Sequence, residues 1–216
     1  MRDRINFNNQ GLGEEIANAI SHGLGALLSI AGLSILLVDA AQSGEAIHVV
    51  TASLYGFGLI FLYLMSTIYH ALRPLSAKWI FQKLDHCSIF LLIVGSYAPI
   101  GLSLIRGGLG WALFGINLAF GTAGIVANAI SVEKWHRLSL MLYLLMGWSV
   151  VIAIKPLLAL VSFQGFLLLL LGGLCYSIGV LFYRAKRPRF MHSIWHLFVL
   201  AGSVFHYFFI LFHVIP

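Results

Sequence analysis

Charged residues are scarce in this chain. Only 9% of its 216 residues are Asp, Glu, Lys or Arg, whereas ordinary soluble domains carry about 25%. A soluble domain with so few charges and 60% hydrophobic residues could not cover its surface with polar groups. The low charge therefore excludes a soluble globular protein and indicates that the bilayer is the solvent.

Other signals are also missing. The two cysteines, Cys87 and Cys175, lie in separate apolar runs without a Cys-x-x-Cys spacing, so we interpret each as a buried free thiol that identifies no compartment. Residues 1–13 are polar and lack the apolar core and cleavage site of a secretory signal peptide. The net charge of +6 comes from short basic clusters between apolar runs. That pattern is typical of loops on an anionic leaflet and argues against nucleic-acid binding.

Long apolar stretches dominate what is present. A membrane-spanning helix needs about 20 apolar residues, and seven stretches are near that length: 18–41, 47–70, 84–105, 109–130, 138–154, 163–183 and 191–213. We therefore predict an all-α integral membrane protein, a seven-transmembrane helix bundle. Residues 1–17 form a cytoplasmic N-terminal segment and 18–213 the transmembrane domain. The short loops make neighbouring helices antiparallel.

The distribution of basic residues predicts the orientation. With a cytoplasmic N-terminus, eleven of the 13 basic residues lie inside: Arg2, Arg4, Arg73, Lys78, Lys83, Lys134, Arg137, Arg184, Lys186, Arg187 and Arg189. Only Arg106 and Lys155 lie outside. This bias predicts a cytoplasmic N-terminus and an extracytoplasmic C-terminus. The parity depends on Lys155-Pro156 being an outer turn, where proline ends a helix.

Glycines within the spans predict close helix packing. The chain has 22 glycines, including Gly121, Gly124 and the pair Gly172-Gly173. Small residues let membrane helices approach closely. We therefore assign these glycines to packing and give them no ligand role.

Two histidines in the last span have the spacing of a metal site. His192 and His196 lie four residues apart, so both imidazoles share one helix face and can bind the same ion. The alternative is a pair of interfacial histidines beside basic residues. This motif alone leaves both interpretations open.

Two further segments carry polar groups at span ends. Ser66 and His70 share a face at the end of the second span, where a histidine is also favoured by the helix dipole alone. Asp85 opens the third span, where a carboxylate is likewise favoured without any function. A pairing of Asp85 with Lys83 or Arg73 is a further alternative.

The predicted topology brings these groups to one depth. His70 lies at the cytoplasmic end of its span, and Asp85, His192 and His196 lie at the cytoplasmic starts of theirs. Three neutral imidazoles and a water complete a tetrahedral zinc site with a reactive position. The Asp85 carboxylate can take a proton from that water. Ser66 can orient His70 or stabilise an oxyanion.

The remaining histidines suggest less. His206 lies about 15 Å or more deeper than His192 at 1.5 Å per residue, so we predict an interhelical hydrogen bond for it. His22 and the pair Glu14-Glu15 could cover the zinc site, but we interpret them as a solvated helix start. The histidines at other span ends are interpreted as interfacial: His48, His136 and His213.

The chain resembles the hemolysin III group of the progestin and adipoQ receptor (PAQR) family over nearly its whole length. The matching segments are EEIANAISHGLG (14–25), STIYHAL (66–72), LDHCSIFLLIVGSYAP (84–99) and HSIWHLFVLAGSVFHY (192–207). The combination of Ser-x-x-x-His, an Asp opening the third span and a late His-x-x-x-His is specific.

The resemblance implies seven helices with the N-terminus inside. It implies zinc on His70, His192 and His196, with Asp85 contacting the zinc-bound water and Ser66 supporting the site. The wider superfamily includes alkaline ceramidases, which implies hydrolysis of lipid amides. Bacterial members resemble inner-membrane proteins of lipid or membrane-energy homeostasis. The large N-terminal region of the animal receptors is absent, which argues against a hormone-receptor role.

Several functions compete at this point. We favour a multi-pass protein of the bacterial inner (plasma) membrane that binds zinc and hydrolyses a lipid amide or ester, with membrane lipids and zinc as partners. One alternative is a sensor or receptor in which zinc is structural. Another is a membrane-perturbing, haemolytic protein, although the spans carry no polar stripe for a pore. An ion-coupled transporter would need a mid-membrane ionisable group, for which only His206 qualifies.

Overall fold

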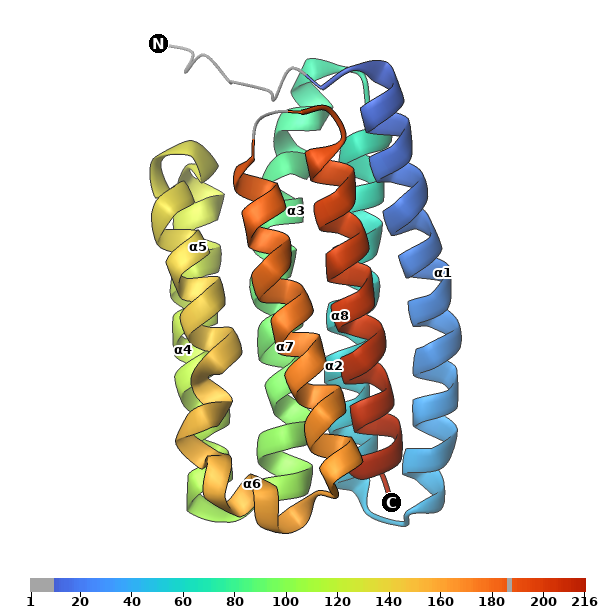
Figure 1. Ribbon diagram of the computed structural model, residues 1–216, viewed down its shortest axis with the longest axis vertical. Helices are drawn as coiled ribbons and strands as arrows, with labels where there is room; N and C mark the ends of the chain where they lie inside the picture. The colour runs from blue at the N-terminus through green and yellow to red at the C-terminus, as the bar shows by residue number, and fades with distance from the viewer. Residues whose placement is uncertain (1–9, 186–187) are drawn as a thin grey trace.

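Each apolar stretch of this chain is helical, because backbone polar groups in lipid must find their hydrogen bonds within the same segment. The computed structural model describes residues 10–185 and 188–216. The helices run alongside one another in a single bundle (Figure 1). They are α1 (Leu12–Gln42), α2 (Ala46–Ala71), α3 (Leu75–Ala98), the π-helix η1 (Pro99–Ile105), α4 (Gly107–Ile130), α5 (Val132–Trp148), the 3-10 helix η2 (Ser149–Ala153), α6 (Ile154–Leu160), α7 (Phe163–Arg184) and α8 (Met191–His213).

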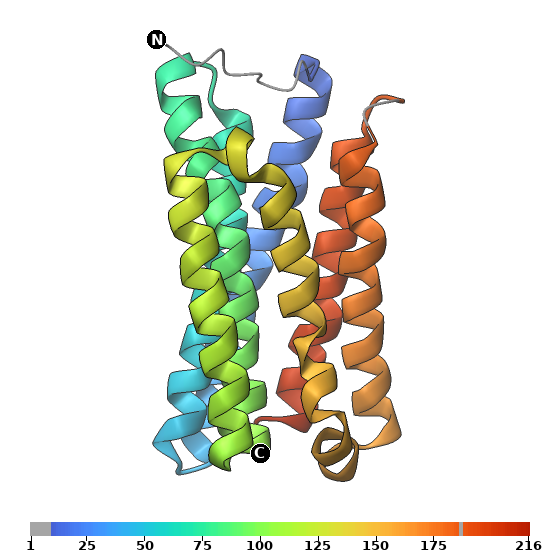
Figure 2. The same cartoon turned by 90° about the vertical axis from the view of Figure 1, so that its left-hand side faces the viewer.

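The predicted number of spans is confirmed. Over the described residues, seven helical segments are long and apolar enough to cross a membrane. Helix α2 packs between α1 and α3, and α8 packs on α7 and α1. Figure 2 shows α5 between the α3–α4 pair and the α7–α8 pair. The end of α2 and the starts of α3 and α8 therefore meet at one end of the bundle (Figure 1).

The third helix begins at Leu75, earlier than the apolar stretch from residue 84 predicts. Its first turns carry two lysines whose charged ends are satisfied by other helices. Lys78 Nζ lies 2.7 Å from Glu15 Oε1 on α1. Lys83 Nζ donates to the carbonyl oxygen of Ala129 at 2.6 Å, near the end of α4. Charged residues therefore extend the helix beyond its apolar part.

The chain turns at the predicted position, Lys155-Pro156, but it does so through a short helix. Helix α5 ends at Trp148, η2 follows it, and α6 carries both residues across the end of the bundle towards α7 (Figures 1 and 2). Pro156 lies in the first turn of α6, where a backbone N–H would have no intrahelical acceptor. The number of spans is unaffected, because α6 ends at the same end of the bundle at which α7 begins (Figure 1).

Glycines bring α4 against α3, as predicted. At Gly124 an added Cβ would meet the ring of Phe90, and at Gly121 it would meet the side chain of Val94. Helix packing therefore explains the glycines of α4.

Both cysteines are free, with Cys87 buried and Cys175 half-buried.

Gly124→Ala is expected to destabilise the bundle, because the new methyl group must displace the Phe90 ring. Overpacking of this kind costs about 1–3 kcal/mol. Thermal unfolding of the detergent-purified protein measures the effect as a lower midpoint. Gly115→Ala is the matched control on the same helix, because an added Cβ there meets nothing within 4 Å. Equal midpoints for the two variants would contradict the packing argument.

Candidate metal centre

Three histidines from two helices converge where α2 ends and α8 begins. His70, His192 and His196 each offer a ring nitrogen, and these three atoms all lie within 4.8 Å of one another. The ring centroids are 5.1 Å apart for His70 and His192, 5.1 Å for His70 and His196, and 4.7 Å for His192 and His196. The structure therefore brings together the three residues that the spacing singled out, close enough to hold one metal ion.

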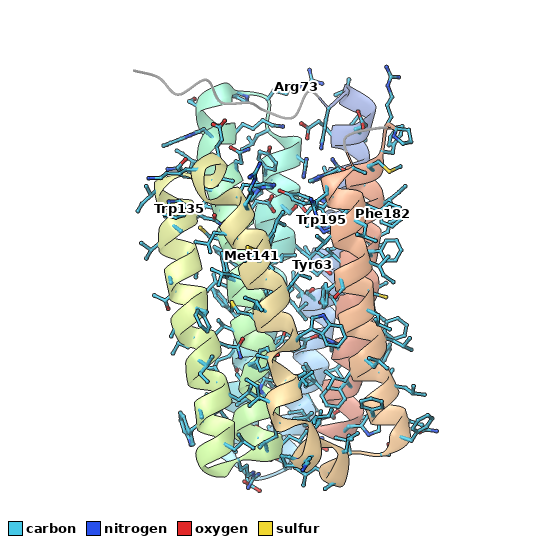
Figure 3. The ribbon with its side chains drawn as sticks, turned by 60° about the vertical axis from the view of Figure 1, so that its left-hand side comes forward. Tyr63, Arg73, Trp135, Met141, Phe182 and Trp195 are labelled. Atoms are coloured by element: carbon cyan, nitrogen blue, oxygen red, sulfur yellow. The ribbon has the colours of Figure 1, made fainter. Side chains whose placement is uncertain are left out.

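The position of this cluster follows from the antiparallel packing. His70 lies in the last turn of α2 and His192 in the first turn of α8. Figure 3 shows Trp195, which lies between the two histidines of α8, in the half of the bundle that ends at Arg73. Because α2 and α8 run in opposite directions, a C-terminal and an N-terminal turn meet at the same depth.

The nitrogens of the cluster lack protein partners. The Nε2 atoms of His70, His192 and His196 are buried and form no hydrogen bond with the described residues. An unpaired buried polar atom costs free energy, so native proteins rarely keep one without a function. Three such atoms on neighbouring histidines match the donor set of a metal site.

Hydrogen bonds on the opposite ring nitrogens set the tautomers. His70 Nδ1 lies 2.7 Å from Glu15 Oε2, and His196 Nδ1 lies 3.3 Å from the carbonyl oxygen of Asn18. Both partners accept, so each Nδ1 carries the hydrogen and each Nε2 keeps its lone pair. This arrangement is typical of histidines that bind a metal through Nε2.

Helix α1 supplies outer partners that sequence reasoning missed. Glu15 joins His70 to Lys78, so the interpretation of this glutamate as part of a solvated helix start is wrong. Asn18 is fully buried and accepts from Ser193 Oγ at 2.6 Å. The detectable signal was a polar stripe at helical spacing in an otherwise apolar helix: Glu15, Asn18 and His22.

His22 is also buried rather than solvated, with a relative exposure of 1%. Its ring stacks on that of His196, with centroids 3.5 Å apart and planes inclined by 11°. Neither ring nitrogen of His22 forms a hydrogen bond with the described residues. Parallel stacked rings direct their lone pairs along separate planes, so His22 supports His196 and does not share its ion.

Asp85 and Ser66 lie beside the histidines. Asp85 is buried, with 5% exposure, and lines the same cavity as His70 and His192. The fully buried Ser66 faces the Asp85 carboxylate from α2, although its Oγ completes no well-formed hydrogen bond.

The alternative pairings of Asp85 with basic residues are not formed. Among the described residues, the salt-bridge contact of Asp85 is with His86, whose Nδ1 lies 3.8 Å from Asp85 Oδ2. Lys83 instead caps the end of α4. The carboxylate is therefore left facing the histidine cluster.

A cavity of about 460 Å³ opens from the histidine cluster into the bundle. Its volume is in the range of small-molecule sites, about 300–1,000 Å³. Near the cluster it is lined by Asp85 and His192, and along its length by apolar residues of α3, α5 and α7 such as Ile93, Leu144 and Val180. The candidate metal centre thus borders a largely apolar chamber between α5 and α7.

Known proteins resemble this chain over its whole length. It is 42% identical to "Hemolysin-3" of Bacillus cereus over 216 residues, which cover 100% of this chain and 99% of the relative. It is 44% identical to "Hemolysin-3 homolog" of Bacillus subtilis (strain 168) over 200 residues, 93% and 94% of the two chains. The "Monocyte to macrophage differentiation factor" of Homo sapiens is 28% identical over 205 residues, 90% of this chain and 82% of the relative.

A family model agrees with these similarities and with the resemblance found in the four sequence segments. The model described as "Haemolysin-III related" matches residues 10–207, which span every helix that contributes to the histidine cluster. The fold, a multi-pass bundle of seven membrane-spanning helices, is the one that the resemblance implies. The chain therefore belongs to the Haemolysin-III related family.

Proposed function

We propose that the protein is a zinc-dependent membrane hydrolase that cleaves an amide or ester bond of a lipid. The observation that carries this proposal is the group of three buried Nε2 atoms without protein partners, beside a buried carboxylate and an apolar cavity. The predicted orientation places this site at the cytoplasmic leaflet of a bacterial inner membrane.

The donor set fits zinc. His70, His192 and His196 would be the ligands, and neutral imidazoles suit zinc among the first-row metals. Three protein ligands are typical of catalytic zinc sites, in which a fourth position stays open. Glu15 would fix the His70 ring from outside, as carboxylates do for metal-binding histidines.

Hydrolysis of an amide adds one water across the C–N bond, so the oxygen goes to the acyl carbon and a proton goes to the nitrogen. Zinc at the three imidazoles supplies a Lewis acid that polarises the carbonyl and activates water. Asp85 accepts a proton from the attacking water and returns it to the leaving nitrogen, which regenerates the carboxylate. In an ester the leaving atom is oxygen. Ser66, whose hydroxyl has no partner among the described residues, would orient His70 or stabilise the oxyanion.

The cavity supports a lipid as the substrate. Its walls between α5 and α7 are mostly apolar, so an acyl chain can move there from the bilayer without losing its apolar surroundings. With the lipid carbonyl held at the histidines, the acyl chain of the lipid would extend into this cavity.

A structural metal is the second candidate. The contacts of Glu15 with His70 and Lys78 already join α1, α2 and α3, and an ion on His70, His192 and His196 would add α8 to this group. Such a protein would act as a membrane sensor and consume no lipid. The Asp85 variant below distinguishes the two functions.

Removal of one ligand is expected to remove the metal. Purified wild-type protein should contain about one zinc per chain, and His70→Ala and His192→Ala should each lose most of it, because two imidazoles bind zinc weakly. Metal analysis by mass spectrometry measures the content. His213→Ala is the control, since this histidine lies at the opposite end of α8 from His192. Unchanged zinc in both ligand variants would refute the site.

Glu15→Gln is expected to weaken zinc binding by about 10–100-fold, the usual effect of removing an outer carboxylate partner of a metal-binding histidine. Competition with a chromogenic chelator gives the affinity. Glu45→Gln is the matched control, because Glu45 pairs with Arg106 between other helices. Equal affinities for wild type and Glu15→Gln would show that the Glu15–His70 contact does not tune the site.

Asp85→Asn is expected to keep zinc and to lose turnover, by roughly 10²–10⁴-fold for loss of a general base. Release of fatty acid from ceramides and phospholipids, measured by mass spectrometry, reports the activity. Asp39→Asn on α1 is the control, because it leaves the site intact. If the zinc-loaded wild type releases no fatty acid from either class, the structural role replaces the catalytic one.

A further inference from the structure

His206 is a polar residue deep in the cavity that the proposed reaction does not use. It follows His196 by ten residues on α8, which places it about 15 Å further along the helix axis. His206 also lines the cavity that begins at the histidine cluster. The imidazole therefore lies near the middle of a bilayer about 30 Å thick, at the far end of the chamber.

One nitrogen of this ring is committed to the neighbouring helix. His206 Nε2 lies 3.2 Å from the carbonyl oxygen of Leu169 on α7, which confirms the predicted interhelical hydrogen bond. The ring reaches this oxygen because Gly172 leaves room for it, and an added Cβ at Gly172 would meet the imidazole. A carbonyl oxygen only accepts, so Nε2 must carry the hydrogen.

The other nitrogen is then an acceptor. No carboxylate of the described residues lies within ion-pair distance of His206, and an unpaired charge is costly in apolar surroundings. The ring is therefore neutral and Nδ1 has a lone pair. Within the part of the chain that the structure describes, Nδ1 forms no hydrogen bond, while the side chain lines the cavity.

Nearby donors do not satisfy this acceptor, because each has another partner. Tyr176 Oη is 2.8 Å from Ser203 Oγ, and Tyr97 Oη donates to the carbonyl oxygen of Met146 at 2.7 Å. Trp148 Nε1 donates to Ser177 Oγ at 2.9 Å. Each of these groups therefore has another partner within the bundle, whereas His206 Nδ1 has none among the described residues.

We propose that His206 Nδ1 accepts a hydrogen bond from a hydroxyl group carried part-way along the chain of the bound lipid. The inference rests on the proposed function in one respect, that the lipid carbonyl lies at the histidine cluster. A hydroxyl is the donor that fits, because a cationic amine would bring an unpaired charge into the same apolar chamber. The ligand class is thus a hydroxylated acyl chain.

Ricinoleate and oleate form a matched pair of probes, because they differ only by a mid-chain hydroxyl. Dissociation constants are measured by tryptophan fluorescence of the zinc-loaded protein in nanodiscs. We expect wild type to bind ricinoleate about two- to tenfold more tightly, the value of one hydrogen bond of about 0.5–1.5 kcal/mol. In His206→Phe the preference is lost and oleate affinity is kept. His213→Phe, the control on the same helix, keeps the preference.

A chemical control is independent of how well any variant folds. Ricinoleate with its hydroxyl methylated cannot donate, so it should bind wild type no more tightly than oleate. Equal affinity of wild type for ricinoleate and oleate would overturn the hydroxyl site alone and assign Nδ1 to a water molecule. Binding of neither fatty acid would overturn the lipid cavity of the proposed function as well. Retained preference in His206→Phe would also overturn the assignment.

Discussion

The physical constraint on the histidine cluster is the free-energy cost of burying imidazole nitrogens that have no hydrogen-bond partner. The last turn of α2 and the first turns of α8 are far apart in the sequence but bring His70, His192 and His196 together. The Nε2 atoms of these histidines have no partner among the described residues. The Nδ1 atoms of His70 and His196 donate hydrogen bonds to Glu15 and to the carbonyl oxygen of Asn18, which hold the two rings in place. Without a ligand these buried Nε2 atoms have no partner among the described residues, and a cation bound there would supply one.

Helix α1 has a larger part in this arrangement than its position at the edge of the bundle suggests. It packs against both helices that supply histidines, and one face of its first turns carries every outer partner described above. Glu15 contacts α2 and α3, whereas Asn18 and His22 contact α8. Many apolar side chains of the remainder of the helix are exposed, as expected for a lipid-facing surface. The polar residues of α1 that contact the cluster thus lie in its first turns.

The cavity connects two polar regions of different character. At the cluster it is bordered by the ionisable side chains of Asp85 and the histidines, and at its far end by hydroxyl, indole and imidazole groups that have partners within the bundle. Between them the walls are apolar. A ligand that fills this space must match polar groups at both ends and an apolar chain between them, which is a stricter requirement than hydrophobic volume alone.

Much of this protein was determined by the sequence itself. Seven apolar stretches of spanning length specify seven helices, because lipid leaves the backbone no other way to satisfy its polar groups. The antiparallel order then requires His70, Asp85 and His192 to share one end of the bundle. The periodicity of α8 puts His192 and His196 on one face. These inferences are local or topological, so they needed no knowledge of packing.

Only the tertiary structure decided the rest. Apolar composition could not show that α3 begins at Leu75, that the turn at Pro156 is a short helix, or that Glu15 and His22 pack against the cluster. The same holds for the free nitrogen of His206, which follows from a carbonyl on α7 and the space left by Gly172. The sequence determines which segments cross the membrane, but side-chain partners are set by rotations and close approaches of helices that no single segment encodes.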